Sequence, residues 1–341
     1  MQSVTFAPMY KWTLTVFCCL FGGFLAAQDV QQLRETARSF QRQGDFENAV
    51  LVLKRAMAIE PDNPDLKKDL GITYYSSRQY DKALEAIKPL IDRADADEQV
   101  YQIAGLVQKT NENYKEAERI YKLGLKKFPQ SGLLYSEYGD LLETKDPGMG
   151  NGIKVWEKGI ETDPEFAGNY YYAAKYYANM SNPVWSMLYG EIFVNLESYT
   201  ARTAEVKNML LANCKKIFVN DIQPAKGKSS FTSEVLNTLQ RQSSVAGSGI
   251  TTESLTAIRA RFILDWDAGK GKDFPFQLFD LQRKFLQDGL FEAYNQWLFG
   301  TVENMSVYQN WTKTHAAEYA EFTKFQQNKV FKIPGGQYYS K

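Results

Sequence analysis

His315 is the only histidine in this 341-residue chain, and Cys214 is the only cysteine after residue 19. A Ser–His or Cys–His nucleophile would have to use this one imidazole, and no catalytic motif surrounds it. One histidine and one cysteine also cannot supply the ligand set of a zinc site. The sequence therefore predicts a protein that is not an enzyme and that holds no metal and no cofactor.

Two further patterns could suggest a ligand or catalytic site. Gly227, Lys228 and Ser229 resemble the end of a phosphate-binding loop, but that motif needs a glycine at position 222, where the chain has Ile222. Glycosidase chemistry needs two carboxylates across a sugar cleft, and no such pair can be read from the sequence spacing. Lys+Arg and Asp+Glu both number 40, so the chain lacks the basic excess of a nucleic-acid binder.

The segment 1–27 is expected to be a signal peptide. Lys11 is the only charge before the apolar run Trp12–Ala27, which is short for a membrane span and typical of a signal-peptide core. The run ends in Leu25-Ala26-Ala27, which offers a cleavage site. We therefore expect a periplasmic or secreted protein, with an uncleaved anchor as the alternative. No later segment is apolar over a length that could span a bilayer.

Several residue types recur at intervals of about 34 residues along the first half of the chain. A small residue in a first helix and an alanine in a second helix would let the two helices approach closely. Proline would end the second helix, because it lacks an N–H. No single hairpin can bury its apolar stripe, so neighbouring hairpins must stack. The recurring residues are Ala37, Gly71, Gly105 and Gly139; Ala49, Ala83 and Ala117; Phe46, Tyr80 and Tyr114; and Pro61 and Pro129, with Pro164 one position late.

This set of residues resembles the tetratricopeptide repeat (TPR) family. The resemblance implies an all-α fold, a TPR α-solenoid of four to five helical hairpins over residues 28–219. The repeats would span about 30–63, 64–97, 98–131 and 132–166, with a degenerate fifth repeat over 167–198 and a closing helix over 200–218.

The chain after residue 219 does not follow the repeat. Residues 220–252 have the composition of a linker that contains a short helix, and residues 253–341 are expected to form an all-helical C-terminal domain. The helices expected there are Thr252–Asp267, Phe276–Gln287, Gly289–Gly300 and Glu303–Gln327.

In TPR proteins the first helix of each hairpin lines a concave groove that binds extended peptides or helices. The resemblance implies a groove that is basic at the first hairpins and acidic at the fourth, and a partner whose acidic residues meet the first hairpins. The groove candidates by position are Arg34, Arg38, Gln41, Arg42, Lys68, Ile72, Tyr75, Gln102, Leu106, Lys109, Glu137, Asp140, Glu143, Tyr171 and Lys175.

The sequence thus favours an exported TPR scaffold or adaptor that binds a protein or peptide segment without catalysis. One alternative is a carbohydrate-binding envelope protein that uses Trp266, Trp297 and Trp311 as aromatic platforms. A third hypothesis, an enzyme in the C-terminal half, has no residue constellation in its favour.

Overall fold

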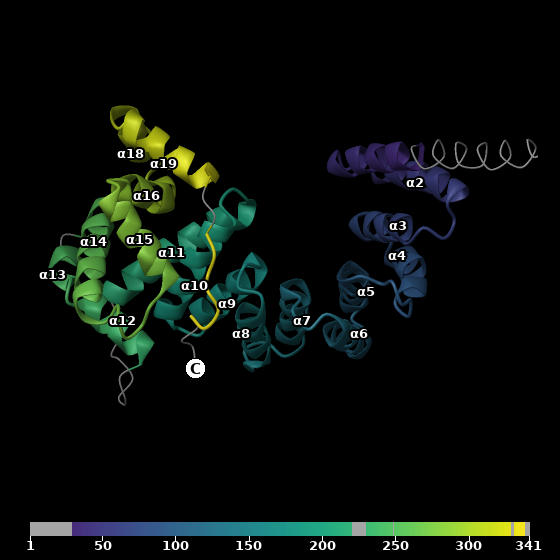
Figure 1. Cartoon of the computed structure of the whole chain (residues 1–341), viewed down its shortest axis with the longest axis horizontal. Helices are drawn as coiled ribbons and strands as arrows, with labels where there is room; N and C mark the ends of the chain where they lie inside the picture. The colour runs from purple at the N-terminus through teal and green to yellow at the C-terminus, as the bar shows by residue number, and fades with distance from the viewer. Residues whose placement is uncertain (1–28, 220–229, 248, 329–330, 338–341) are drawn as a thin grey trace, which may run out of the picture. The chain divides into compact units, whose positions relative to one another are not determined.

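The computed structural model describes residues 29–219, 230–247, 249–328 and 331–337. The predicted signal peptide lies outside these residues, as does most of the polar stretch 220–230. Within the described ranges every regular element is a helix and no strand occurs, which confirms the all-α prediction (Figure 1). None of the helices in these ranges combines the length and apolar composition needed to cross a membrane.

The described residues from 29 to 196 fold into five helical hairpins. Residues 29–42 are helical and form the first hairpin with α2. Polar side chains cap many of these helices: Asp45 and Asp97, for example, accept hydrogen bonds from the N–H three positions later. The helices are α2 (Phe46–Ile59), α3 (Pro64–Ser76), α4 (Tyr80–Ile87), α5 (Glu98–Thr110), α6 (Tyr114–Lys127), α7 (Gly132–Lys145), α8 (Asn151–Thr162), α9 (Ala167–Asn179) and α10 (Pro183–Leu196).

Contacts divide the chain into two compact units, with the boundary inside α6, between Gly124 and Leu125. The first unit holds the first three hairpins up to Gly124, and the second holds the end of α6 and the remaining helices. The predicted domain boundaries at residues 219 and 252 stay a prediction.

Small residues lie at the contact between the two helices of a hairpin. Ala37, Ala49, Ala83 and Ala117 are all fully buried in the first unit. Pro61 is exposed in the turn after α2. A methyl group added at Gly105 would lie only 2.4 Å from Cε1 of the buried Tyr121 ring, so this glycine is required by the packing.

The glycine equivalent to Gly105 has more space in the second repeat and as little space in the fourth. A methyl group at Gly71 would meet nothing closer than 3.6 Å, which is ordinary van der Waals contact. At Gly139, in the second unit, it would lie 2.3 Å from Nε1 of Trp156, whose ring donates a hydrogen bond to the Ser136 carbonyl at 3.1 Å. The aromatic side chain of the second helix, rather than the repeat position itself, therefore decides how small the first-helix residue must be.

We expect Gly105→Ala and Gly71→Ala to have opposite effects on the first unit. Overpacking against Tyr121 should lower the free energy of unfolding by about 1–3 kcal/mol. Gly71→Ala should raise it by up to about 1 kcal/mol, because alanine favours the helix and the site has room. Urea unfolding followed by circular dichroism measures both, and equal effects of the two substitutions would contradict this account of the packing.

The second unit is built around α10. Twelve of its 14 residues are buried, so this helix is enclosed on nearly all sides. The helices of this unit that follow it are α11 (Ala201–Val219), α12 (Phe231–Gln240), α13 (Ser243–Ala246), α14 (Thr252–Gly269), α15 (Gln277–Gln287), α16 (Phe291–Asn295), a π-helix η2 (Gln296–Gly300), α17 (Thr301–Glu303), α18 (Met305–Thr314) and α19 (Ala316–Asn328).

Two of the expected C-terminal helices differ from the structure. The helix expected over 289–300 begins at Phe291 in the structure and continues as the π-helix. Gly289 has a φ of 72°, a left-handed conformation that lies outside the helix. The expected single helix 303–327 is divided into three elements. Asn304 has extended backbone, and its side chain accepts from two N–H groups of α18, so it starts a new helix instead of continuing α17. The backbone at His315 ends α18.

A buried polar network joins α10 to the C-terminal helices. The Glu191 carboxylate accepts hydrogen bonds from the Arg259 guanidinium, from the Gln282 amide at 2.7 Å and from the Tyr294 hydroxyl at 2.8 Å. Asn195 donates to the same tyrosine oxygen at 2.8 Å. Burial raises the pKa of Tyr294, and the Glu191 charge raises it further. The charge of Arg259 is thus compensated inside a dry core.

We expect Glu191→Leu to lower the free energy of unfolding of the second unit by about 3–5 kcal/mol, because it leaves the buried Arg259 charge without its carboxylate. The double variant Glu191→Leu with Arg259→Leu should recover most of that loss, since no buried charge remains. Guanidinium unfolding monitored by tryptophan fluorescence compares the two. A double variant no more stable than the single one would show that the ion pair is not what the fold requires.

Candidate functional site

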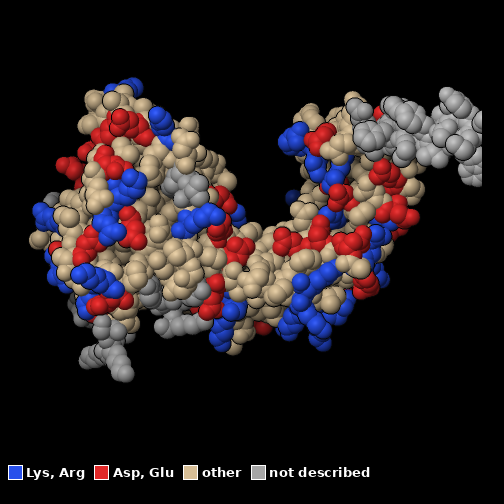
Figure 2. Space-filling model, in the orientation of Figure 1, with Lys and Arg blue, Asp and Glu red and all other residues tan. Residues whose placement is uncertain are grey.

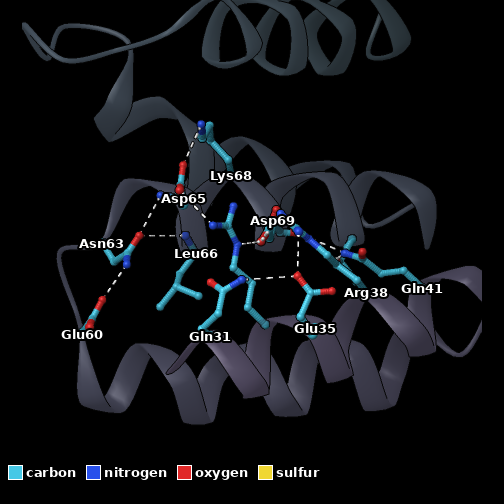
Figure 3. A network of polar contacts seen from close by, with 12 residues as sticks. Gln31, Glu35, Arg38, Gln41, Glu60, Asn63, Asp65, Leu66, Lys68 and Asp69 are labelled. Atoms are coloured by element: carbon cyan, nitrogen blue, oxygen red, sulfur yellow. Dashed lines mark hydrogen bonds and ion pairs between the residues drawn. The ribbon is translucent and has the colours of Figure 1, made fainter. Parts of the chain in front are cut away.

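An ion-pair ladder runs across the first helices of the first unit (Figure 3). Arg34, in the helix over 29–42, pairs with two carboxylates on α3: its Nη1 lies 2.9 Å from Asp65, and its Nε donates to Asp69. Lys68 continues the ladder from α3, pairing with Asp65 at 2.9 Å and with Asp97 at the start of α5. Each pair between helices joins one hairpin to the next.

The two cations of this ladder, Arg34 and Lys68, occupy one recurring position of the repeat. Arg34, Lys68 and Gln102 stand one repeat length apart, so they occupy the same position in successive repeats. All three were predicted to contact a partner, whereas the acceptors Asp65 and Asp97 were not predicted. These two carboxylates lie at the starts of the facing helices. An acidic residue at the start of each following helix was the signal that could have revealed them.

The ladder compensates the charge that was expected to make this surface basic. On the described first helices, Arg34, Arg38 and Lys68 face the carboxylates of Asp65, Asp69 and Asp97. Figure 2 shows basic and acidic side chains interspersed over this end of the first unit. Binding of an acidic partner segment therefore stays a prediction. The ion pairs leave this surface with less uncompensated positive charge to attract such a segment.

Pairing also changes the protonation of the ladder. The hydrogen bond from Lys68 lowers the pKa of Asp65, although partial burial opposes the shift. The nearby Arg34 charge lowers this pKa further. The carboxylate thus stays ionised to a lower pH than a free aspartate would.

The other first-unit residues that were predicted to line the groove differ in the contacts that they make. Arg38 pairs with Glu35 at 3.0 Å, and the Tyr75 hydroxyl lies 3.4 Å from that of Thr110. Gln41 donates to the Thr73 hydroxyl at 2.5 Å. Arg42 is exposed and forms no ion pair with the described residues.

One apolar side chain stands out on this face. Ile72 is 44% exposed and lies one helical turn after Lys68 and Asp69 on α3. Gln102, Leu106 and Lys109 are half-buried on α5.

In the second unit, Tyr171 and Lys175 face α11. The Tyr171 hydroxyl donates to Glu205 at 2.6 Å, and Lys175 pairs with the same carboxylate at 2.8 Å. The half-buried Glu137 and Asp140 lie on α7. Their charges help to raise the pKa of Tyr172, an effect that comes mainly from burial.

Cys214 and His315, the residues considered for nucleophilic chemistry, lie in different surroundings. Cys214 is buried, which raises the pKa of its thiol to about 12 and makes it a poor nucleophile. His315 stacks on Trp311 with ring centroids 4.6 Å apart. The part of the chain that the structure describes holds no cluster of three metal-ligating side chains.

The carbohydrate alternative loses the aromatic platforms on which it relied. Trp266, Trp297 and Trp311 are all buried, so none is an exposed platform for a sugar. Trp266 instead packs against Phe262 and Phe279 in the core of the second unit.

Paired antiparallel helices that recur at a regular interval, with small residues at their crossings, define a helical-repeat protein. The tetratricopeptide repeat family model matches residues 41–106. Residues 41–106 therefore carry the tetratricopeptide repeat, a repeat that generally serves protein interactions. A search of curated proteins found no significant match.

Comparison with solved structures finds matches of low sequence identity, one of them described as a TPR protein. The TPR protein TTC0263 of Thermus thermophilus has 13% identity and a TM-score of 0.47, over 53% of this chain and 99% of that chain. Pseudomonas aeruginosa pilF has 15% identity and a TM-score of 0.46, over 64% and 92%. MamA from Desulfovibrio magneticus RS-1 has 18% identity and a TM-score of 0.38, over 50% and 94%.

We expect the ladder to stabilise the first unit and to weaken in acid. Arg34→Gln and Asp69→Asn should each lower the free energy of unfolding by about 1 kcal/mol, and a double-mutant cycle should show coupling between them. Because the pKa of Asp65 is lowered in the folded state, its contribution is present above about pH 4 and is lost as the pH falls through the lowered value.

Urea unfolding of the wild type and the three variants at pH 7 and at pH 3 measures this contribution. The stability gap between the wild type and Arg34→Gln should narrow at the lower pH. A gap that stays constant, or a cycle without coupling at pH 7, would show that the ladder does not hold the hairpins together.

Proposed function

We propose that this protein is an exported, non-catalytic scaffold that binds a protein or peptide segment on the first-helix face of its TPR hairpins. The observation that carries the proposal is the exposed Ile72 beside the ion-pair ladder. An apolar side chain on a face whose charges are already paired offers a partner a site that costs little desolvation.

The ladder gives this face a second useful property. Because Arg34 and Lys68 fix each first helix to the next, the face is organised before a partner arrives, and little conformational entropy is lost on binding. Arg42 and Tyr75 belong to the first helices of the first two hairpins, and they supply a cation and a phenol ring. A segment with an apolar anchor and an acidic residue near its Arg42 end suits these groups.

Export is the second part of the proposal. Its support is the apolar run Trp12–Ala27 after a single positive charge, with small residues at its end. An exported scaffold would meet partners in the periplasm or outside the cell.

The test compares two exposed isoleucines of the first unit. Ile72 and Ile59 are both 44% exposed, but Ile72 lies on a first helix and Ile59 on the second helix α2. Ile72→Asp should lower recovery of the bound partner at least about fivefold in affinity capture from native extract, whereas Ile59→Asp should leave it unchanged.

Recovery is quantified by mass spectrometry, and circular dichroism checks that both variants stay folded. In the same experiment, the intact mass of the protein from its native source should correspond to a chain that begins at Gln28. Equal recovery with both variants would reject the first-helix face, and an uncleaved chain retained in the producing cell would reject export.

A further inference from the structure

A cleft of about 810 Å³ lies within the second unit, among helices that do not belong to the repeat. One wall is a single face of α14, formed by Thr252, Glu253, Thr256, Ala257 and Ala260 at helical spacing. The second wall is α18, and the π-helix, which contacts both α14 and α18, lines the cleft together with the start of α16.

The α18 wall presents apolar surface that the neighbouring helices of the described chain cover only in part. Trp311 is the only buried residue of α18, and its Nε1 donates to Glu292 at 2.6 Å. Val307 and Tyr308 line the cleft beside it, and Val307 is 59% exposed. Met305 is 51% exposed at the start of the same helix. A helix anchored by one side chain with further apolar groups in the open is incomplete as a packing unit.

The charged side chains that line the cleft are all acidic. They are Glu253, Glu292 and Glu303, and the lining contains no lysine, arginine or histidine. Glu303 accepts from the backbone N–H of Thr252 at 2.6 Å, and Glu292 accepts from the Trp311 ring. Neither these two nor Glu253 forms an ion pair with a described residue. Three uncompensated carboxylates around an apolar cleft favour a cationic occupant.

The Gln296 amide also faces this cleft without a hydrogen-bond partner among the described residues. Gln296 lines the cleft and is 7% exposed, yet its side chain makes no hydrogen bond to the described residues. An added methyl group at Gly300 would lie 2.6 Å from Oε1 of Gln296, so this glycine leaves room for the amide. The amide is open to the cleft, where it offers two donors and one acceptor oxygen to a ligand. It lies in a π-helix, an irregularity that occurs frequently at functional sites.

We propose that this cleft binds an amphipathic segment of a partner protein that carries lysine or arginine around an apolar anchor. The anchor would lie between Ala257 and Ala260 on α14 and Val307 on α18. The basic side chains would pair with the three glutamates of the lining, and a polar group of the segment would bond Gln296. The cleft volume suits a few side chains rather than a whole domain. A helix in a groove is the binding mode that such a cleft supports.

This site is independent of the proposed first-helix face, because it lies in the second unit and uses acidic rather than basic residues. Either site could fail its test without affecting the other.

The first experiment uses a fluorescein-labelled peptide of about 18 residues, with Leu and Lys placed so that a helix has one apolar face. A second peptide replaces each Lys by Glu. Fluorescence anisotropy with the full chain should show binding of the Leu/Lys peptide at least about tenfold tighter than that of the Leu/Glu peptide. Equal affinities, or no binding of either peptide, would overturn the proposal.

The second experiment locates the binding. Glu253→Lys changes an exposed lining residue, and the control Glu321→Lys makes the same charge change on exposed α19, outside the cleft. Ala257→Trp fills the apolar wall. Glu253→Lys and Ala257→Trp should each weaken the Leu/Lys peptide at least about fivefold more than the control does. Equal effects of Glu253→Lys and Glu321→Lys would show that the acidic cleft is not the site.

A second copy of this chain is the competing occupant. Sedimentation velocity of the protein alone should show a monomer. A dimer that Glu253→Lys dissociates would show that the chain fills its own cleft, and it would overturn the assignment to a separate partner.

Discussion

Glu191 is the group on which the second unit depends, because it is a buried charge at the centre of an enclosed helix. A carboxylate in a dry core is tolerated only with donors around it. Arg259, Gln282 and Tyr294 supply them from three different helices, α14, α15 and α16. The fifth hairpin is therefore not a free end of a solenoid. Its second helix is the centre of a larger helical unit, and the C-terminal helices cover the apolar surface that a further repeat would otherwise have to cover.

The first unit meets the same packing constraint with exposed rather than buried polar groups. Its hairpins share small residues at the helix crossings, and Arg34 and Lys68 tie each first helix to the next. The resemblance to TPR proteins had assigned these cations to partner contact. When such a position is used within the protein, specificity must come from its neighbours. Ile72 and Arg42 are the neighbours that remain accessible on this face.

The two proposed surfaces therefore differ in chemistry. The first-helix face offers an apolar side chain among compensated charges, whereas the cleft of the second unit offers apolar walls among uncompensated carboxylates. A scaffold with two such surfaces could hold two dissimilar partners. The buried Cys214 belongs to neither surface, and His315 stacks on Trp311 at the edge of the cleft.

The sequence by itself determined the hairpins and their order. The repeat period, helix-capping residues and small crossing residues act over one or two turns, and local rules of this kind can be read from one chain. It did not reveal the division of the last helix at Asn304 and His315, or the π-helix at Gln296. Only the tertiary structure decided which polar groups meet, since Glu191 and Tyr294 are far apart in the sequence and yet share a hydrogen bond. It also decided that Arg34 serves the fold and that three glutamates from different elements share one cleft, because no local pattern encodes contacts between distant segments.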